Sequence, residues 1–551
     1  MPLFTWGVPL LAGGLVVHYV VSKMVYPVLW SPIDNLPGPL TSSFWESNLH
    51  QLFDSRRSWA AHEKLAQVYG RTLRVFGLAK FDQRVLSMDP SVISHVLHRP
   101  SIYQKPWQTR AFISAIIGES LLSSEGGKHR RQRRVADQAF SERNLQSFLP
   151  IMFSRAAELT ERWVAIADKS DEGKATIDVV NWIQRTTLDV IGEVGFGVNL
   201  NALNDEHNEL HLTYKEMFGV LLKRQHPLIT LIGISLPRLQ PWIPTDMFTT
   251  LTRCKSAVHE FGSKLIEEKR QLLSGQEKCK ARDFLTLFLK ANSQPDLSED
   301  QRMSDQELLD IVNTMLSAGS DTTALSIVWA LHYLSINPAV QARLKEELAN
   351  IPVYNASQIC SEEEIIAHFN AIDRLPYLDA VMKETIRLAP SIHSTIRVAM
   401  TDDEIPLSEE MIMRDGSIEK TFKVKKGQWI HLPLEATSID RTIWGEDAWE
   451  FKPERWDSLP EKVADLRGPY ANMLSFSAGP RVCIGMRFAQ MEWKIDLHHI
   501  ISCLTFGPTA KIVKGTVSFS RPYVEEDWRK GRPSSLPLSV SRDLPEEAVC
   551  T

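Results

Sequence analysis

One cysteine stands in a glycine-containing loop directly ahead of a helical pattern, and this loop constrains the chain more than any other stretch. Residues 476–485 read Phe-Ser-Ala-Gly-Pro-Arg-Val-Cys-Ile-Gly. Apolar residues then recur at spacings of four, three and four from Ile484 to Ile495, which predicts an amphipathic helix. Cys483 therefore lies at or just before a helix N-terminus. The partial positive charge there favours a thiolate over a thiol.

The neighbours of this cysteine suit a flat, anionic metal cofactor. Gly479 and Gly485 remove side chains on either side of the sulfur, so a large flat group can approach the backbone. Arg481 stands two residues before the cysteine and can meet an anion on that group. Such a thiolate suits an axial ligand of haem iron. A lone cysteine is more often a small buried hydrophobic residue, so its neighbours carry the argument.

The complete pattern F-x-x-G-x-R-x-C-x-G resembles the haem-binding signature of the cytochrome P450 family. Its fixed positions are Phe476, Gly479, Arg481, Cys483 and Gly485. The resemblance implies that these residues bind haem b and that the Cys483 thiolate is the axial ligand of the iron. It also implies the family's fold, which is a mainly α haem-thiolate domain with a minor β region.

Composition sets wide bounds. The chain has 551 residues, of which 43% are hydrophobic and 23% charged, so it can form a large globular core. A net charge of -5 gives no strongly basic surface for a nucleic acid. Six cysteines are scattered without a C-x-x-C pair, which fits a reducing compartment without disulfides or a zinc ribbon. They are Cys254, Cys279, Cys360, Cys483, Cys503 and Cys550.

The N-terminus predicts a membrane anchor. Residues 1–22 contain no Lys, Arg, Asp or Glu, and Leu3 to Val21 is nearly all apolar. This is about the minimum length for a bilayer-spanning helix. A cleaved signal peptide is the alternative, but there is neither a basic n-region nor a small-x-small site before Lys23. The first cation follows the apolar run, so the positive-inside rule places the rest of the chain in the cytosol.

A proline-rich stretch follows the predicted anchor. Prolines flank a glycine in Leu36-Pro37-Gly38-Pro39, which stops any helix and stiffens the chain. The stretch resembles the hinge of membrane-bound family members. We therefore expect an anchor over residues 1–30, a hinge over 31–45 and a catalytic domain over 46–551. The resemblance implies a single-pass protein of the endoplasmic reticulum membrane.

Other stretches predict local structure. Trp59 to Tyr69 reads as a helix, and the alternating run Thr72 to Phe76 predicts a small sheet near the N-terminus. Residues 187–197 read as a helix that ends in a glycine stop at Gly197. We expect residues 101–122 to form a loop that caps the substrate pocket, as in the family. Residues 203–250 are expected to form a mobile lid. A charged insertion over 401–427 is expected to form a surface hairpin.

A basic run over residues 128–134 follows the predicted cap. On a helix, His129 and Arg133 lie one turn apart on one face, from which they can reach both propionates of a haem. A solvated face or a nucleic-acid patch is the alternative. Members of the family often carry W-x-x-x-R here. This chain has His129 at the tryptophan position, so the resemblance supports Arg133 more directly than His129.

A long helix is predicted from Ser304 to Asn337. Ser304 and Glu307 form a capping box, and Pro338 ends the apolar stripe that follows. At about 1.5 Å per residue the helix spans about 50 Å. Its middle reads Ala-Gly-Ser-Asp-Thr-Thr over residues 318–323, which are mostly poor helix formers. Such a local cost is expected where function demands it.

This mid-helix stretch resembles the A-G-x-D-T-T motif of the same family. A surface polar patch is the alternative, but apolar turns flank the stretch on both sides. The resemblance implies that Thr322 hydrogen-bonds dioxygen at the haem and that Asp321 passes protons from solvent.

Two further segments resemble the family's structural motifs. Glu384 and Arg387 lie at i, i+3 on a predicted helix over 375–388. Downstream, Pro-Glu-Arg-Trp over residues 453–456 resembles the family's P-E-R-F segment. The resemblance implies that Arg455 completes a buried network with Glu384 and Arg387 that holds the cysteine loop. It also implies that Arg397 contacts a propionate.

The resemblance covers about residues 35–545 and implies a monooxygenase that inserts one oxygen atom from O2 into a lipophilic small molecule. The chain shows no flavin or NADPH module. Electrons are therefore expected from NADPH–cytochrome P450 reductase, with cytochrome b5 as a second candidate donor.

The substrate is expected to be a secondary metabolite such as a terpenoid. The stretch from Thr401 is similar to fungal members that oxidise such compounds, and the pocket segments are apolar. Two alternatives stay open. One is a haem-thiolate isomerase that rearranges an already oxidised substrate, and the other is a membrane haem protein without turnover. The acid–alcohol pair at residues 321 and 322 counts against both.

Overall fold

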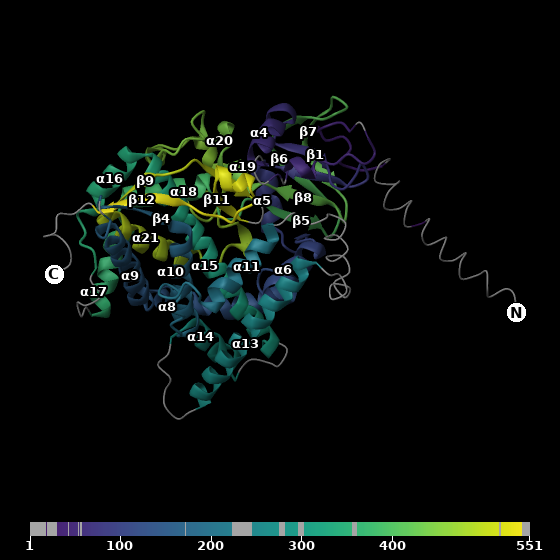
Figure 1. The fold of residues 1–551 in the computed structure, drawn as a ribbon. Coiled ribbons are helices and arrows are strands. Elements are labelled where there is room, and N and C mark those ends of the chain that lie inside the picture. Colours follow the sequence, from purple (N-terminus) through teal and green to yellow (C-terminus); the bar gives the residue numbers. More distant parts are fainter. Residues whose placement is uncertain are drawn as a thin grey trace. The chain divides into compact units, whose positions relative to one another are not determined.

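The structure is a computed structural model that shows two compact units (Figure 1). Unit 1 takes in the described residues up to Pro106 together with Ile392–Trp449 and Pro460–Val482. Unit 2 takes in Trp107–Ser391, Glu450–Leu459 and the described residues from Cys483 onward. The structure describes residues 18, 30–41, 43–52, 54, 58–170, 172–222, 245–274, 282–295, 302–354, 361–516 and 519–542.

Helices predominate in the described residues, so the predicted mainly α class with a minor β region is confirmed. The predicted anchor, residues 1–30, lies outside the described residues except for His18 and Trp30. No helix in the described ranges is long and apolar enough to cross a membrane.

Unit 1 is built on a five-stranded sheet. Its strands run in the order β1-β2-β8-β5-β3, and only the β2–β8 pair is parallel. The strands are β1 (Thr72–Phe76), β2 (Gln83–Ser87), β3 (Tyr103–Gln104), β5 (Thr395–Ala399) and β8 (Trp429–Leu432). The sheet predicted from the alternating run at Thr72 is therefore confirmed. Buried Leu73, Val75 and Leu86 of β1 and β2 pack with Leu52 and Leu65.

Short helices complete unit 1. The predicted helix at Trp59 is α4 (Ser58–Tyr69). The others are α3 (Leu49–Leu52), α5 (Pro90–His98), α19 (Leu434–Ser438), α20 (Arg441–Trp444) and the 3-10 turns η5 (Glu461–Leu466) and η6 (Gly479–Arg481).

The proline-rich segment packs along the edge strand β1. The backbone N–H of Arg74 donates to the Pro37 carbonyl at 2.8 Å. A Cβ on Gly38 would lie 2.1 Å from the Arg74 carbonyl oxygen, so only glycine fits this approach. The segment thereby covers part of an edge that is otherwise open to strand pairing.

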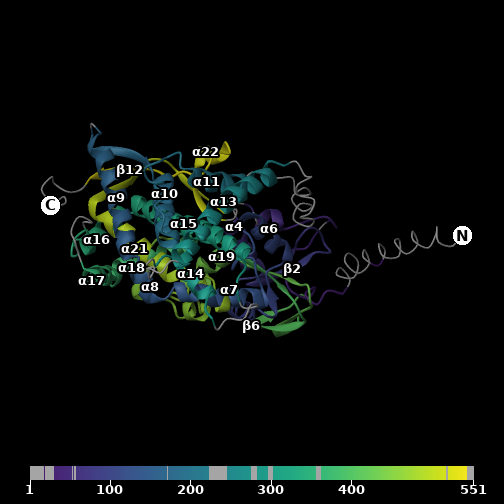
Figure 2. The ribbon, with the colours of Figure 1, turned by 90° about the horizontal axis from the view of Figure 1, so that it is seen from below.

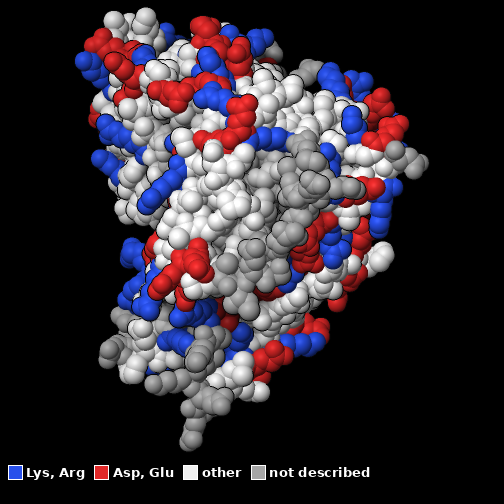
Figure 3. Space-filling model, turned by 90° about the vertical axis from the view of Figure 1, so that its left-hand side faces the viewer, with Lys and Arg blue, Asp and Glu red and all other residues white. Residues whose placement is uncertain are grey.

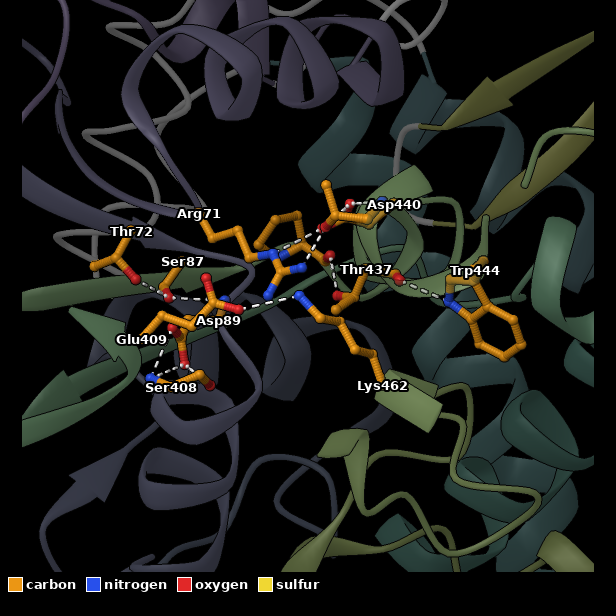
Figure 4. A network of polar contacts seen from close by, with 12 residues as sticks. Arg71, Thr72, Ser87, Asp89, Ser408, Glu409, Thr437, Asp440, Trp444 and Lys462 are labelled. Carbon is orange, nitrogen blue, oxygen red and sulfur yellow. Dashed lines mark hydrogen bonds and ion pairs between the residues drawn. The ribbon is translucent and has the colours of Figure 1, made fainter. Parts of the chain in front are cut away.

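The predicted charged hairpin is confirmed as β6 (Asp403–Ile412) paired antiparallel with β7 (Ile418–Val424). Asp89 ties this hairpin to α5. Its carboxylate caps the helix by accepting from the Ser91 N–H at 2.8 Å, and it also accepts from Ser408 N at 3.0 Å and Ser408 Oγ at 2.7 Å. Nearby, Lys462 donates to Glu409 at 3.1 Å (Figure 4).

Unit 2 is organised along the long helix α15 (Asp305–Ile336), which begins at the predicted Ser304–Glu307 capping box. Helix α10 (Val179–Phe196) packs along it, as Figures 1 and 2 both show. A Cβ on Gly319 would lie 2.8 Å from Cδ1 of Ile191, so glycine allows this close helix contact. The glycine stop predicted for α10 is Gly197, with φ of 67°.

The remaining elements of unit 2 surround this pair. The helices are α6 (Trp107–Ile117), α7 (Gly126–Ala139), α8 (Glu142–Gln146), α9 (Leu149–Asp168), α11 (Glu209–Leu222), α13 (Asp246–Ser274), α14 (Phe284–Asn292), α16 (Pro338–Leu348), α17 (Glu362–Asp373), α18 (Pro376–Leu388), η4 (Pro453–Asp457), α21 (Met486–Cys503) and α22 (Glu525–Arg529). One sheet has the order β4-β12-β9, and β10 pairs with β11. These strands are β4 (Lys174–Asp178), β9 (Leu504–Pro508), β10 (Ile512–Thr516), β11 (Ser520–Val524) and β12 (Pro537–Arg542).

The expectation of a loop over residues 101–122 is wrong for its central part, where α6 runs from Trp107 to Ile117. Proline at position 106 precedes the helix, and the apolar residues from Phe112 to Ile117 have helical spacing. The side chain of Asn313 on α15 donates to the Ile116 carbonyl at 3.1 Å, which fixes the end of α6. The predicted lid over 203–250 falls partly outside the described residues.

The charged side chains are mixed in sign. On the face shown in Figure 3, Lys and Arg lie among Asp and Glu, which agrees with the small net charge of the chain.

We predict that Asp89→Ala lowers the free energy of unfolding by about 2 kcal/mol, because it removes a helix cap and leaves the Ser408 N–H without its acceptor. Urea unfolding measures this change. The matched control is Asp415→Ala at the exposed hairpin tip, where one carboxylate accepts from Ser417 N, and it should cost under about 0.5 kcal/mol. Equal effects of the two substitutions would contradict the anchoring role of Asp89.

Candidate functional site

The helix predicted after the cysteine is α21, which begins three residues later at Met486. The side chain of Cys483 is exposed, yet protein atoms surround it closely enough that desolvation raises the pKa of its thiol. A backbone hydrogen bond from Gly485 and the charge of Arg133 act in the opposite direction. The expectation that the helix N-terminus favours a thiolate stays a prediction, and the Gly485 backbone and the Arg133 charge act in its direction. A coordinating metal ion deprotonates a thiol outright.

Helix α7 brings the predicted basic pair toward this cysteine. His129 is buried, and Arg133 lies one turn later on the same helix. Arg133 donates from Nε to Asp137 at 2.7 Å. Its charge also lowers the pKa of the Cys483 thiol, so the two groups lie within electrostatic reach of each other.

Three residues of the predicted cysteine loop, Phe476, Gly479 and Arg481, belong to unit 1. A Cβ on Gly479 would lie 2.5 Å from the Leu97 carbonyl oxygen, and its φ is 65°. Backbone packing therefore demands glycine at this position, independently of any cofactor. Arg481 ends the turn η6, and the ring of Phe476 lies 6.2 Å from that of Tyr470.

Arg397 lies on β5 in unit 1 and is buried. Its guanidinium donates to the neighbouring Ile396 carbonyl at 2.9 Å, which holds the side chain close to its own strand.

The residues present suit a haem by their chemistry. In unit 2, an accessible cysteine lies within reach of the Arg133 charge, and a cysteine thiolate is an established haem ligand. Arginines such as Arg133, and Arg397 in unit 1, match the carboxylates of propionates. Gly485 has a φ of -86°, and a Cβ there would meet only a ring carbon of Phe140 at 3.8 Å.

The acid–alcohol pair on α15 is held by specific partners. The hydroxyl of Thr322 donates to the Ala318 carbonyl at 2.7 Å, one turn back in the helix. Ser391 donates from Oγ to the Thr322 carbonyl at 2.8 Å. A hydroxyl bonded back to its own helix often bends the helix, and here this occurs within the predicted motif.

Asp321 is buried and is held from two sides. Gln184 of α10 donates to Oδ1 at 2.7 Å, and Arg521 of β11 forms an ion pair with Oδ2. Sequence reasoning missed both partners, because they stand 137 and 200 residues away. The one available signal was a lone arginine in the stretch Phe-Ser-Arg-Pro-Tyr over 519–523.

The structure brings together Glu384, Arg387 and Arg455. Glu384 and Arg387 have no exposed side-chain surface, and they meet at 2.7 and 2.9 Å. Arg455 of η4 donates to the same carboxylate at 3.3 Å. Two donors that the sequence did not reveal complete the site, namely the Lys452 N–H at 3.0 Å and Trp456 Nε1 at 3.1 Å.

Comparison with known proteins decides the family. The family model for cytochrome P450 matches residues 37–514. The chain belongs to the cytochrome P450 family. It is similar to cytochrome P450 monooxygenase 205 of Postia placenta, with 35% identity and coverage of 94% of each chain. It is also similar to the ganoderic acid synthetase of Ganoderma lucidum, with 30% identity over 94% of this chain and 95% of the relative.

A crystal structure of another cytochrome P450 shares the fold. It has a TM-score of 0.69 and 21% identity, and the match covers 92% of this chain and 99% of that chain. The predicted P450 fold is therefore confirmed.

Two carboxyl groups on α21 of this P450 are buried without partners. Glu492 and Asp496 are one turn apart, and each is only 1% exposed. None of their four oxygens has a hydrogen-bond partner among the described residues. Burial raises the pKa of Glu492 well above its ordinary range, and it raises the pKa of Asp496 to about 8. Burial therefore favours the protonated form of both groups in the folded protein.

We predict that the contribution of this buried pair to stability falls as the pH rises from 5 to 8. A carboxyl group whose folded pKa is raised holds its proton in the folded state after the unfolded chain has lost it, so its contribution is greatest below about pH 4. Each such proton gives a slope of up to about 1.4 kcal/mol per pH unit. Asp496→Asn removes one such contribution, so its free energy of unfolding should rise relative to that of the wild type from pH 5 through 6.5 to 8 in urea unfolding.

The matched control is Asp168→Asn, which changes a half-exposed carboxylate paired with Arg542. It should leave the slope unchanged. Parallel curves for the wild type and Asp496→Asn would contradict the buried-acid assignment.

Proposed function

We propose that this P450 is a monooxygenase that inserts one oxygen atom from O2 into a lipophilic small molecule. The observation that carries the proposal is that one compact unit holds both Cys483 ahead of α21 and the Asp321–Thr322 pair on α15. A haem bound through Cys483 supplies the activation of dioxygen. An isomerase or a carrier without turnover has no use for an acid–alcohol pair.

In this proposal, side chains of the protein bind the haem and transfer the protons that the reaction needs. Cys483 would hold the haem iron as a thiolate, and Arg133, His129, Arg397 and Arg481 would meet the propionates. Thr322 can turn its hydroxyl from the Ala318 carbonyl, 2.7 Å away, toward dioxygen. Gln184 and Arg521 each donate to one carboxylate oxygen of Asp321, and the remaining lone pairs of these oxygens can accept and pass a proton.

We propose a secondary metabolite of the terpenoid class as the substrate. The support is the similarity to a ganoderic acid synthetase and to several P450 monooxygenases of Postia placenta. The residues that follow Asp321 on α15 are mostly apolar and buried, which suits a lipophilic neighbour in the core.

We further propose that NADPH–cytochrome P450 reductase supplies the electrons, with cytochrome b5 as a second donor. Residues 1–30 are proposed to anchor the chain in the endoplasmic reticulum membrane, with the rest in the cytosol. The support is the uncharged apolar run over residues 1–22, followed by cations.

We predict that Thr322→Ala uncouples the reaction. Oxygen and NADPH are still consumed, but product formed per O2 falls by at least about tenfold, because one positioned proton donor typically contributes about 10²–10⁴-fold to a single step. Parallel measurement of oxygen uptake, NADPH oxidation and product tests this. Thr323→Ala makes the same chemical change one residue later and should stay coupled. Unchanged coupling in Thr322→Ala would contradict the role of its hydroxyl.

We also predict that deletion of residues 1–30 releases the protein from the membrane fraction, because the uncharged apolar run is removed. Fractionation of cells that express the full chain and the shortened chain measures this. A shortened protein that stays with the membrane at high salt would contradict residues 1–30 as the main anchor.

A further inference from the structure

Unit 2 contains a cavity beside Asp321 that the proposed function does not use. Helices α10, α11 and α15, strand β11 and residues 533–534 form its walls. Its volume is about 70 Å³. Since one water molecule needs roughly 10–15 Å³ of such space, the cavity has room for a larger group. Its lining combines two cations, Lys215 and Arg521, with apolar side chains that include Leu188 and Phe218.

Arg521 is a buried cation with unused hydrogen-bonding capacity. Its side chain is 6% exposed and packs over the ring of Phe218 at 5.4 Å. An arginine carries five N–H donors. Among the described residues, its one hydrogen-bond partner is Asp321, so the remaining donors of this cavity-lining group are available to a ligand.

Lys215 is the second cation of the lining. It makes no hydrogen bond or ion pair within the described parts of the chain. Its charge nevertheless acts on its surroundings. Burial, followed by the charges of Lys215 and Arg185, lowers the pKa of His211 to about 4. His211 is therefore neutral at pH 7. The described lining carries two positive charges and the negative charge of Asp321, and Asp178, outside the lining, lies within electrostatic reach of Lys215.

We propose that this cavity binds the anion of a short aliphatic carboxylic acid, with Lys215 and Arg521 as its donors. The planar fork of a guanidinium matches the two oxygens of a carboxylate. Leu188 and Phe218 cover the hydrocarbon part, which favours a carboxylate over an inorganic anion that has no apolar surface to bury. The bound carboxylate then shares Arg521 with Asp321.

Calorimetric titration of the full-length protein with butyrate at constant ionic strength tests the site. We expect saturable binding with a dissociation constant of roughly 1 mM. Butyramide has the same shape without the charge and should bind at least tenfold more weakly. Inorganic phosphate should also bind more weakly than butyrate. The measurement needs no turnover, so its outcome is separate from that of the proposed oxygenation.

A second experiment compares butyrate binding in the wild type and in variants of Lys215. Lys215→Gln should weaken butyrate binding at least tenfold, and Lys215→Arg should restore it. The matched control is Lys264→Gln, which removes an exposed lysine of α13 paired with Glu260 and should leave binding unchanged. Equal affinity for butyrate and butyramide, an unchanged constant in Lys215→Gln, or tighter binding of phosphate would each overturn the proposal.

Discussion

The hydrogen bonds to the carboxylate of Glu384 are the interaction on which the attachment of η4 to α18 in unit 2 depends. This carboxylate is fully buried and accepts five hydrogen bonds, from two guanidiniums, an indole and a backbone N–H. Removing one partner of such a cluster leaves an uncompensated buried charge, which costs about 3–5 kcal/mol. The cluster therefore fixes α18 to η4 across about 70 residues of intervening chain. No step of the proposed chemistry passes through it.

A second buried ion pair serves a different purpose. Asp321 and Arg521 meet on α15 and β11, but one side of the pair faces a cavity, whereas Glu384 is enclosed. A pair that borders open space can exchange partners at a lower cost in desolvation than an enclosed one. Within unit 2, the enclosed Glu384 cluster therefore has a structural role, whereas the Asp321 carboxylate can change its partners. The close contact of Gly319 with Ile191 keeps α10, and with it Gln184, against the same turn of α15.

Much of this fold could be predicted from the sequence. The capping box at Ser304, the glycine stop at Gly197 and the hairpin at 403–424 are local signals, and local hydrogen bonds decide them. The Glu384 cluster was predicted only through the family resemblance, because spacing alone cannot link residues 384 and 455. Local sequence patterns did not predict features that depend on contacts between distant segments. The partners of Asp321 come from distant segments, and residues 107–117 were expected to form a loop but are the helix α6.

The central claim is that Cys483 holds the iron of a haem as a thiolate. The most direct test is the absorption spectrum of the reduced protein with carbon monoxide, for the wild type and for Cys483→Ser. Thiolate ligation predicts a strongly red-shifted Soret band in the wild type that the variant loses. An unshifted band in correctly folded wild-type protein would mean a different axial ligand and would contradict the monooxygenase assignment.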